Sequence, residues 1–577
     1  MQLLDWMVVV VYFILTAWIG VHYARRAGSS LEEFFLSGRN LPWWLAGTSM
    51  VATTFAADTP LAVTELVARN GIAGNWLWWS AAIGGMLTVF FFARLWRRAG
   101  ILTDVELVEL RYSGRAAAFL RGFRALYLGV FMNAVIMAWV NLAMATILEG
   151  MFGISRGQVV FYVALALLIT AVYSAVSGLW GVAVTDAFQF VLAMAGTTAL
   201  AVIVLSLPEV GGMSGLVAKL PEWSLRFTPE VGAAATEGVG ATLALSVSAF
   251  IAFIGVQWWA SWYPGAEPGG GGYIAQRMMS AKDERHSLFA TLWFTVAHYC
   301  VRPWPWILVG LATLVLYPEL GPADKKLGYV YAMRDHLPTG MRGALVASFF
   351  AAYMSTIATQ LNWGASYVIN DFYRRFLKPA AAEKDLVWAS RVTTILLMAM
   401  SLLVMAMLDT ISGAWGFILE ASAGLGLVLI LRWFWWRVNA WSEIAAMVAA
   451  LAATGGLRAF TSIAFPHSLF VIVSITTISW LIATFATPAT DMQTLEAFYR
   501  RVRPGGPGWR PVALRAPDVT ADVGMGALFA DWAAGVAFVY ATLFAIGFAL
   551  FGRHGDAAIA VVVAAAAVAL IYRDLSR

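Results

Sequence analysis

Residues 49–70 read SMVATTFAADTPLAVTELVARN. This stretch is apolar enough for a bilayer, yet it holds the carboxylates Asp58 and Glu65 and the helix breaker Pro60. Pro60 removes a backbone donor and clashes with the preceding turn, and Asp58 is placed to cap a helix that begins there. We therefore expect a membrane helix that unwinds around residues 52–57 and restarts after Asp58. Such a break is tolerated only against protein or a wet cavity, where freed carbonyls can bind a cation.

Composition places the chain in a membrane. Its 577 residues are 61% hydrophobic and 12% charged, whereas a soluble domain carries about 25% charged residues. The net charge of +5 is typical of basic loops beside a membrane and does not indicate nucleic-acid binding. The single cysteine, Cys300, excludes an internal disulfide framework and a multi-cysteine metal site. The first apolar run lacks a basic n-region and a cleavage site, so we interpret it as a span.

The apolar runs predict an all-α integral membrane protein with about fifteen transmembrane helices, because a chain in lipid must satisfy its own backbone. Each run is bounded by charge, Gly or Pro. The expected spans lie near residues 5–23, 41–68, 73–97, 122–152, 157–176, 182–206, 240–263, 287–317, 342–371, 388–407, 411–432, 440–456, 468–487, 527–551 and 557–572.

The basic residues predict the orientation. With the N-terminus outside and the C-terminus cytoplasmic, about 27 of the 38 Lys and Arg residues fall on the inner side, as the positive-inside rule requires. An error of one span would scramble this pattern. We expect a multi-pass protein of the inner or plasma membrane in which the lipid bilayer is a partner, and the oligomeric state stays open.

Span lengths suggest an inverted repeat. The fourth and ninth spans are both long, and each is third in a group of five. Two copies with an odd number of spans have opposite topology, which suits a five-plus-five inverted-repeat transporter. The expected divisions are an extra N-terminal helix and cytoplasmic loop at 1–40, a transport core at 41–433 (halves 41–206 and 240–433), two peripheral helices at 434–487, a cytoplasmic loop at 488–526 and two C-terminal helices at 527–577.

The ninth span carries a stripe of small and hydroxyl residues. Ala352, Ser355, Thr356 and Thr359 are spaced i, i+3, i+4 and i+7, so they share one helical face. Two hydroxyls plus a few freed carbonyls would offer the neutral oxygens that Na⁺ prefers. The alternative is a small-residue packing seam between helices. For the broken span, the alternative is that Asp58 only caps the helix and that its neighbouring threonines bond back to their own carbonyls.

Several motifs in order give the chain a resemblance to the sodium:solute symporter family. They are FFLSGRNLPWWLAGTSMVAT at 34–53, Thr185-Asp186 with Gln189, QRMMSAKDE at 276–284, NDFY at 370–373 and WRVNAWSEIA at 436–445. The resemblance spans roughly residues 5–487 and implies the LeuT-type inverted-repeat fold preceded by one extra helix. The last two spans and the loop before them lie outside the common family core.

The resemblance also implies a sodium site between the broken span and the ninth. Its ligands would be carbonyl and hydroxyl oxygens of Ala52, Phe55, Ala352, Ser355 and Thr356. Asp186 matches a family aspartate near the sodium exit, and some members add a second site that uses it. Thr359 is present for such a site, but Ala358 replaces the other hydroxyl, which puts a second Na⁺ in doubt.

Solute contacts in the family come from the broken span and from the sixth core helix. The corresponding residues here are Thr54, Asp58, Thr59, Gln257, Trp258 and Trp259, with Asn133 as a further candidate. Asp58 and the tryptophans suit an amine through charge and cation–π contact. The same set suits a sugar, whereas a carboxylate would prefer a helix N-terminus or an arginine. Arg302 lies in the middle of an apolar run and is unexplained by the motifs.

The function predicted from these features is sodium-coupled import of a small organic solute by alternating access. Na⁺ is the expected coupling ion, and no cofactor is expected. An enzyme is disfavoured because the chain lacks HExxH and GxxxxGK[ST] motifs. The alternatives are a proton-coupled or uncoupled transporter of the same fold and, less favoured, a membrane solute sensor.

Overall fold

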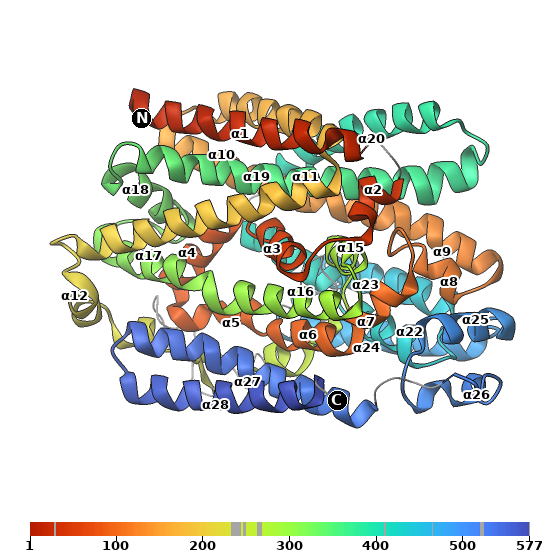
Figure 1. Cartoon of the computed structure of the whole chain (residues 1–577). Helices are drawn as coiled ribbons and strands as arrows, with labels where there is room; N and C mark the ends of the chain where they lie inside the picture. The colour runs from red at the N-terminus through yellow and green to blue at the C-terminus, as the bar shows by residue number, and fades with distance from the viewer. Residues whose placement is uncertain are drawn as a thin grey trace.

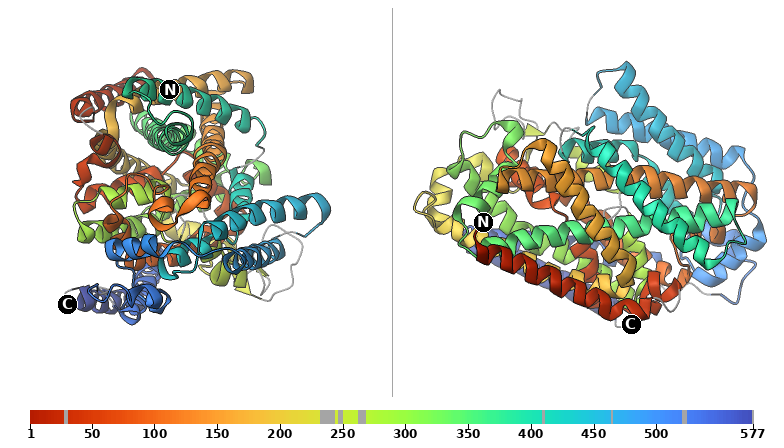
Figure 2. Two further views of the ribbon diagram at one scale, coloured as in Figure 1. Left: turned by 90° about the vertical axis from the view of Figure 1, so that its right-hand side faces the viewer. Right: turned by 90° about the horizontal axis from the view of Figure 1, so that it is seen from above.

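The computed structural model describes residues 1–27, 31–231, 244–245, 250–261, 268–408, 411–463, 465–519 and 524–575. Within these ranges the chain is almost wholly helical, and its long helices run side by side (Figure 1). Figure 2 shows the same bundle from two further sides, with many helices seen nearly end-on in its left view. One short parallel pair joins β1 (Glu230–Val231) to β2 (Ala244–Leu245). The predicted all-α membrane class is confirmed.

The elements fall into three stretches along the chain, in which η marks short 3₁₀ or π segments. The first comprises α1 (Leu3–Ala27), α2 (Leu31–Leu36), η1 (Ser37–Arg39), α3 (Trp43–Thr53), α4 (Asp58–Asn70), η2 (Ile72–Asn75), α5 (Trp76–Trp79), α6 (Ala82–Leu87), η3 (Thr88–Phe92), α7 (Ala93–Ala99), α8 (Leu107–Arg111), α9 (Gly114–Leu126), η4 (Tyr127–Met132), α10 (Asn133–Phe152) and α11 (Arg156–Ser206). The second comprises α12 (Gly212–Lys219), η5 (Glu222–Leu225), η7 (Ala252–Gln257), α14 (Trp258–Ala260), α15 (Gly272–Ser280), α16 (Glu284–Val296), η8 (Ala297–Val301), α17 (Pro303–Leu316), η9 (Pro322–Asp324), α18 (Leu327–His336), α19 (Met341–Ser366), η10 (Tyr367–Leu377), α20 (Glu383–Met405), α21 (Ile411–Ala421) and α22 (Leu425–Phe434). The third comprises α23 (Ala440–Phe460), α24 (His467–Ala486), α25 (Met492–Val502), η11 (Pro507–Trp509), α26 (Arg510–Ala513), α27 (Met525–Leu550) and α28 (His554–Leu575).

Eleven helices of the described residues are long and apolar enough to cross a membrane, or twelve when the bent pair α21–α22 counts as one span. The predicted count of about fifteen is therefore not confirmed. The expected span at 41–68 is divided between the short helices α3 and α4. The expected spans at 157–176 and 182–206 both lie in α11, which consists of two helical parts that meet at a kink at Gly178, where φ is +57°. The expected span at 240–263 lies partly outside the described residues.

The ninth expected span forms the centre of the bundle. In the most apolar part of the Met341–Leu377 span, which comprises α19 and η10, 89% is buried inside the protein. The corresponding share for α28 is 17%. It packs against α1, α10, α11 and α20. The stripe of small residues therefore faces protein along its whole length, and α28 lies at the edge of the molecule (Figure 1).

The C-terminal pair attaches to the core through α27. The Tyr540 hydroxyl donates to Trp79 O at 2.9 Å, and the Trp532 indole donates to Ile83 O at 3.0 Å. A Cβ on Gly535 would lie 2.6 Å from the Phe90 ring, so glycine is needed for this close approach. These contacts bind α27 to the third expected span, and α28 packs in turn on α27.

The segment 488–526, expected as a polar loop, is partly helical and packs on the core. Asp491 caps α25 by accepting from Thr494 N–H at 3.1 Å. The Trp509 indole donates to Trp433 O at 2.7 Å, and α25 lies against α7 and α8. The segment thus joins the end of α22 to the end of the third expected span.

Candidate functional site

The predicted break is present between α3 and α4. Helix α3 ends at Thr53 and α4 begins at Asp58, so the unwound residues are 54–57, inside the predicted range. Thr59 Oγ1 donates to Thr54 O at 3.3 Å across the break. The carbonyl of Phe55 accepts no hydrogen bond from the described residues. The expectation that Asp58 caps α4 is wrong, because Ala57 is the N-cap residue and no side chain bonds the first turn.

The end of α3 contacts the stripe on α19. The Thr356 hydroxyl lies 3.0 Å from both Ala352 O and Thr53 O, and its single proton can be donated to one of them at a time. All three residues are buried. This contact brings carbonyls of the broken span and oxygens of α19 to one place. The C-terminal end of α3 adds the negative end of its helix dipole there.

A buried polar network lies beside this contact and is centred on Asp186 of α11. Its carboxylate accepts from the Ser355 hydroxyl at 2.5 Å and from the Ser49 hydroxyl at 2.6 Å. Arg277 of α15 lies 3.8 Å from the Asp186 carboxylate and donates to Thr359 Oγ1 at 3.3 Å. The structure therefore brings together the two residues predicted for sodium release or a second site, with a fixed cation between them.

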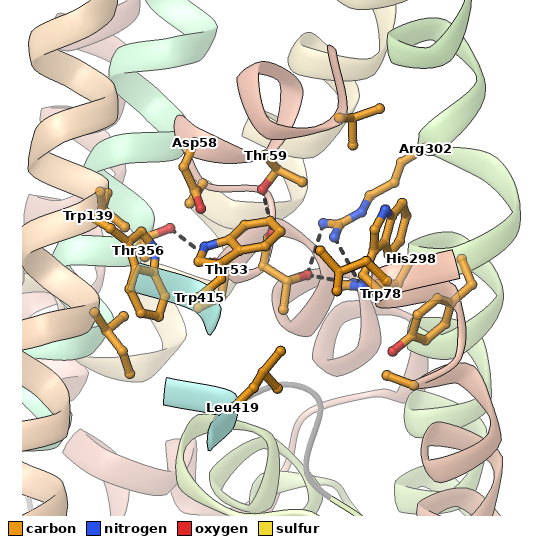
Figure 3. A pocket seen from close by; sticks show the side chains of 18 of the residues that line it. Thr53, Asp58, Thr59, Trp78, Trp139, His298, Arg302, Thr356, Trp415 and Leu419 are labelled. Atoms are coloured by element: carbon orange, nitrogen blue, oxygen red, sulfur yellow. Dashed lines mark hydrogen bonds between the residues drawn. The ribbon is translucent and has the colours of Figure 1, made fainter. Parts of the chain in front are cut away.

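A cavity of about 120 Å³ lies between the break, α10, η8, α19 and α21 (Figure 3). A single water needs only about 10–15 Å³ of such space, so the cavity can hold considerably more than one water. That volume suits a small organic molecule. Its polar and aromatic lining includes Thr53, Thr54, Asp58, Thr59, Trp78, Trp139, Gln257, Tyr273, His298, Tyr299, Arg302, Thr356, Gln360 and Trp415.

A cationic cluster forms one wall of the cavity. Arg302, 2% exposed, donates from Nη1 to Thr54 Oγ1 at 3.0 Å and to Val51 O at 3.4 Å. Its Nη2 lies 3.1 Å from His298 Nε2, and His298 Nδ1 lies 3.0 Å from Thr54 Oγ1. Arg302 also stands over the Trp306 ring, 5.4 Å from its centre. The cluster joins the start of α17 to the unwound segment.

Asp58 lies at another part of the cavity wall. It is 3% exposed, and its Oδ1 has no hydrogen-bond partner among the described residues. The indole nitrogen of Trp415, which lines the same cavity, is likewise without a hydrogen-bond partner in the described part of the chain. In Figure 3, Asp58 and Arg302 lie on opposite sides of Thr59. The cavity therefore presents a carboxylate and a guanidinium at separate positions.

Four of the predicted solute residues line the cavity, namely Thr54, Asp58, Thr59 and Gln257. Three others are directed elsewhere. Asn133 donates to Gln360 O at 2.8 Å and so joins α10 to α19. The Trp258 and Trp259 indoles donate to carbonyls one turn back in their own helix, and the Trp258 ring packs in a tilted arrangement against Trp532 of α27, with ring centres 5.8 Å apart.

The prediction missed much of the lining. His298 stands one helical turn before Arg302, and this i, i+4 pairing of two polar residues in an apolar run was the available signal. The others are aromatic or amide residues of a kind common in packed membrane helices, with no signal in the sequence. They are Trp78, Trp139, Tyr273, Tyr299, Gln360 and Trp415.

A broken span, a central helix with a hydroxyl stripe and a buried polar cavity between them define a secondary transporter. Residues 34–451 match the sequence model of the Sodium:solute symporter family, and the chain belongs to that family. It is a sodium-coupled symporter for a small organic solute, it crosses the membrane many times, and it is not an enzyme. The resemblance found in the sequence is confirmed.

Curated relatives support the same family. A sodium/glucose cotransporter of Vibrio parahaemolyticus is 26% identical over 484 residues, which cover 78% of this chain and 84% of the relative. A sodium/mannose cotransporter of Bos taurus is 25% identical over 496 residues and covers 78% of each chain. Among solved structures, a Na⁺-coupled sialic acid symporter in a substrate-bound outward-open state aligns with a TM-score of 0.65 at 18% identity, covering 85% of this chain and 99% of that one. That alignment shows a shared fold.

Proposed function

We propose that the chain binds Na⁺ between the end of α3 and the middle of α19. The ligands would be the carbonyls of Ala52, Phe55 and Ala352 and the hydroxyls of Ser355 and Thr356. The observation that carries this proposal is the Thr356 hydroxyl, which lies 3.0 Å from carbonyls of both helices. Unwound carbonyls and half-helix C-terminal ends are the usual sodium ligands of such transporters.

Neighbouring contacts favour the same position. The carbonyl of Phe55 accepts no hydrogen bond from the described residues and is available to a cation. Ser355 donates its proton to Asp186, which leaves its oxygen lone pairs for Na⁺. Asp186 and Thr359 would then assist the release of Na⁺. Their place in the Arg277 network favours a role in release over a second site.

The solute would bind in the cavity lined by Thr54, Asp58, Thr59 and Gln257. The two relatives described above are cotransporters of glucose and mannose, so a solute of monosaccharide size is the natural first class to test. Na⁺ at the unwound segment would fix Thr54 and Thr59 in place and strengthen solute binding. Because such coupling is reciprocal, the solute strengthens sodium binding by the same factor.

We further propose that the N-terminus is outside and the C-terminus cytoplasmic in the cell membrane. Support comes from the distribution of Lys and Arg. α8, α9, α25 and α26 lie at one end of the bundle (Figure 1), and this end carries many of the arginines expected on the inner side. Rocking of one repeat against the other would expose the cavity to each side in turn.

Sodium-dependent uptake into proteoliposomes tests the sodium site. The variant Thr356→Ala should raise the sodium concentration for half-maximal uptake by about tenfold or more, a change of ~1.4 kcal/mol in sodium binding. The matched control is Ser348→Ala on the same helix, because its hydroxyl donates only to Ala344 O within α19. A Thr356→Ala protein with an unchanged sodium response would rule out these ligands.

A further inference from the structure

We infer that the solute carries a carboxylate, held by the Arg302 guanidinium that Thr54 and His298 orient, and a hydrogen-bond donor that reaches Asp58. This inference rests on the proposed function, because it takes the same cavity as the solute site. It narrows the solute class to small acids with an ammonium or hydroxyl group, such as amino acids or sugar acids. A neutral sugar lies outside that class.

The first support is the position of Arg302. A guanidinium keeps its charge at any physiological pH and presents a planar fork of donors. Here it stands in the cavity wall at 2% exposure, with Nη1 and Nη2 directed at Thr54 and His298. A charged side chain at membrane depth is costly and is by default a functional candidate.

Hydrogen accounting shows how the guanidinium is oriented. Thr54 donates its one hydroxyl proton to Val51 O at 2.8 Å, so Thr54 Oγ1 accepts from Arg302 Nη1 and from His298 Nδ1. The imidazole proton is thereby assigned to Nδ1, and Nε2 is left to accept from Arg302 Nη2. The neutral imidazole of His298 and the hydroxyl of Thr54 thus fix the orientation of the Arg302 guanidinium plane. A fixed, planar guanidinium is suited to a carboxylate, which forms bidentate, charge-assisted hydrogen bonds.

The second support is Asp58, an acceptor at another position in the same wall. Its Oδ1 is buried and has no hydrogen-bond partner among the described residues. A buried acceptor without a partner costs free energy until a ligand donor satisfies it. The solute should therefore bring an ammonium or hydroxyl to Asp58.

The two groups together distinguish between solute classes. A neutral sugar can donate to Asp58, but it offers Arg302 only neutral acceptors, whose hydrogen bonds are about half as strong as those of a carboxylate. A simple amine can donate a hydrogen bond to Asp58, but its positive charge is repelled by the Arg302 guanidinium. A molecule with both an acid and a donor group matches both positions, and Trp78, Trp139 and Trp415 enclose its apolar surface.

Binding of solutes to the purified full-length protein tests this inference. The readout is the rise in the protein's melting temperature, measured in NaCl and in KCl. The probes are matched pairs that differ in the acid group: D-glucuronate with D-glucose, D-galacturonate with D-galactose, L-alanine with L-alaninamide, and L-serine with L-serinamide. Stabilisation by acids but not by their neutral partners, in sodium only, is the expected result. Stabilisation by a neutral sugar with no response to its acid overturns the inference. A lack of response to every acid overturns it as well.

Substitutions of Arg302 and Asp58 then show which side chain contacts which group of the solute. Arg302→Gln should weaken binding of the acid found by about ten- to hundredfold, as expected for a lost charged hydrogen bond, and Arg302→Lys should restore part of it. Asp58→Asn should weaken an amino acid much more than a sugar acid, because only the ammonium loses a charge partner. The matched control is Arg69→Gln at the far end of α4, where Arg69 pairs with Glu65 at 3.0 Å outside the cavity. Unchanged acid binding in both Arg302 variants would refute the assignment.

The effect of Na⁺ in the absence of solute distinguishes a failure of this inference from a failure of the proposed function. Stabilisation by NaCl over KCl without solute depends on the sodium site and not on Arg302. If that difference is present in the wild-type protein and absent in Thr356→Ala, the sodium site stands whatever the solute panel shows. If it is absent in the wild-type protein, the proposed function fails first.

Discussion

Removing the Glu443 carboxylate should destabilise the protein more than removing any exposed charged group. Glu443 of α23 pairs with Arg124 at 3.1 Å and with Arg432 at 3.4 Å, and it accepts from the Tyr112 hydroxyl at 2.7 Å. The three charged side chains are 1–4% exposed. This cluster lies where α9, α22 and α23 meet, and its carboxylate, Glu443, belongs to the motif WRVNAWSEIA at 436–445.

The magnitude follows from burial. Glu443→Ala leaves two guanidinium groups in a site without their carboxylate, and breaking a buried pair costs about 3–5 kcal/mol. For 577 residues, an unfolding entropy of about 2.1 cal/mol/K per residue converts this to a fall of about 2–4 °C in melting temperature. Arg432→Met in the same chain should recover part of the loss, because it removes one uncompensated charge.

The assay is the melting temperature of detergent-solubilised protein, read from intrinsic tryptophan fluorescence. The matched control is Glu496→Ala, which removes an exposed carboxylate 3.0 Å from Arg500 and should melt with the wild-type protein because exposed ion pairs contribute little. A Glu443→Ala protein that melts with this control would show that the cluster does not hold the three helices together.

Two further outcomes follow from the geometry. Sodium activation of uptake should have a Hill coefficient near 1, because Arg277 already stands 3.8 Å from Asp186 and bonds Thr359; a coefficient near 2 would show that the guanidinium leaves and a second ion binds. In a Cys300→Ser background, a membrane-impermeant maleimide should label Glu319→Cys in intact cells and Leu514→Cys only after permeabilisation; the reverse pattern would invert the proposed orientation.

Local chemistry made the broken span predictable. Pro60 lacks a backbone N–H and clashes with the preceding turn, so a helix that arrives from the N-terminal side is interrupted before it. The observed break at 54–57 lies within the predicted range 52–57. The stripe on α19 was predictable because helical spacing alone places its members on one face. The motif around Asn439 also reflects local structure, since Asn439 and Ser442 form a capping box at the start of α23.

Side-chain direction between helices could not be predicted in this way. Asn133 and Trp258 are of the right chemical type for solute binding, but their partners at Gln360 and Trp532 are set by how distant helices pack. Arg302 was visible as a charge in an apolar run, but its role depends on Thr54, 248 residues away in the chain. Trp415 carried no signal because tryptophan is common both in packing and at membrane interfaces.

One short segment connects the two proposed sites. Residues 51–55 would supply Na⁺ with the carbonyls of Ala52 and Phe55, while Val51 O and Thr54 Oγ1 orient Arg302. The Phe55 ring packs on Trp306, 5.0 Å away, and Arg302 stands over the same ring. An ion that fixes this segment therefore also fixes the guanidinium that would receive the solute. Because the linkage is reciprocal, an acid bound at Arg302 must tighten sodium binding, and a variant that frees Arg302 from Thr54 should weaken the coupling while each site is retained.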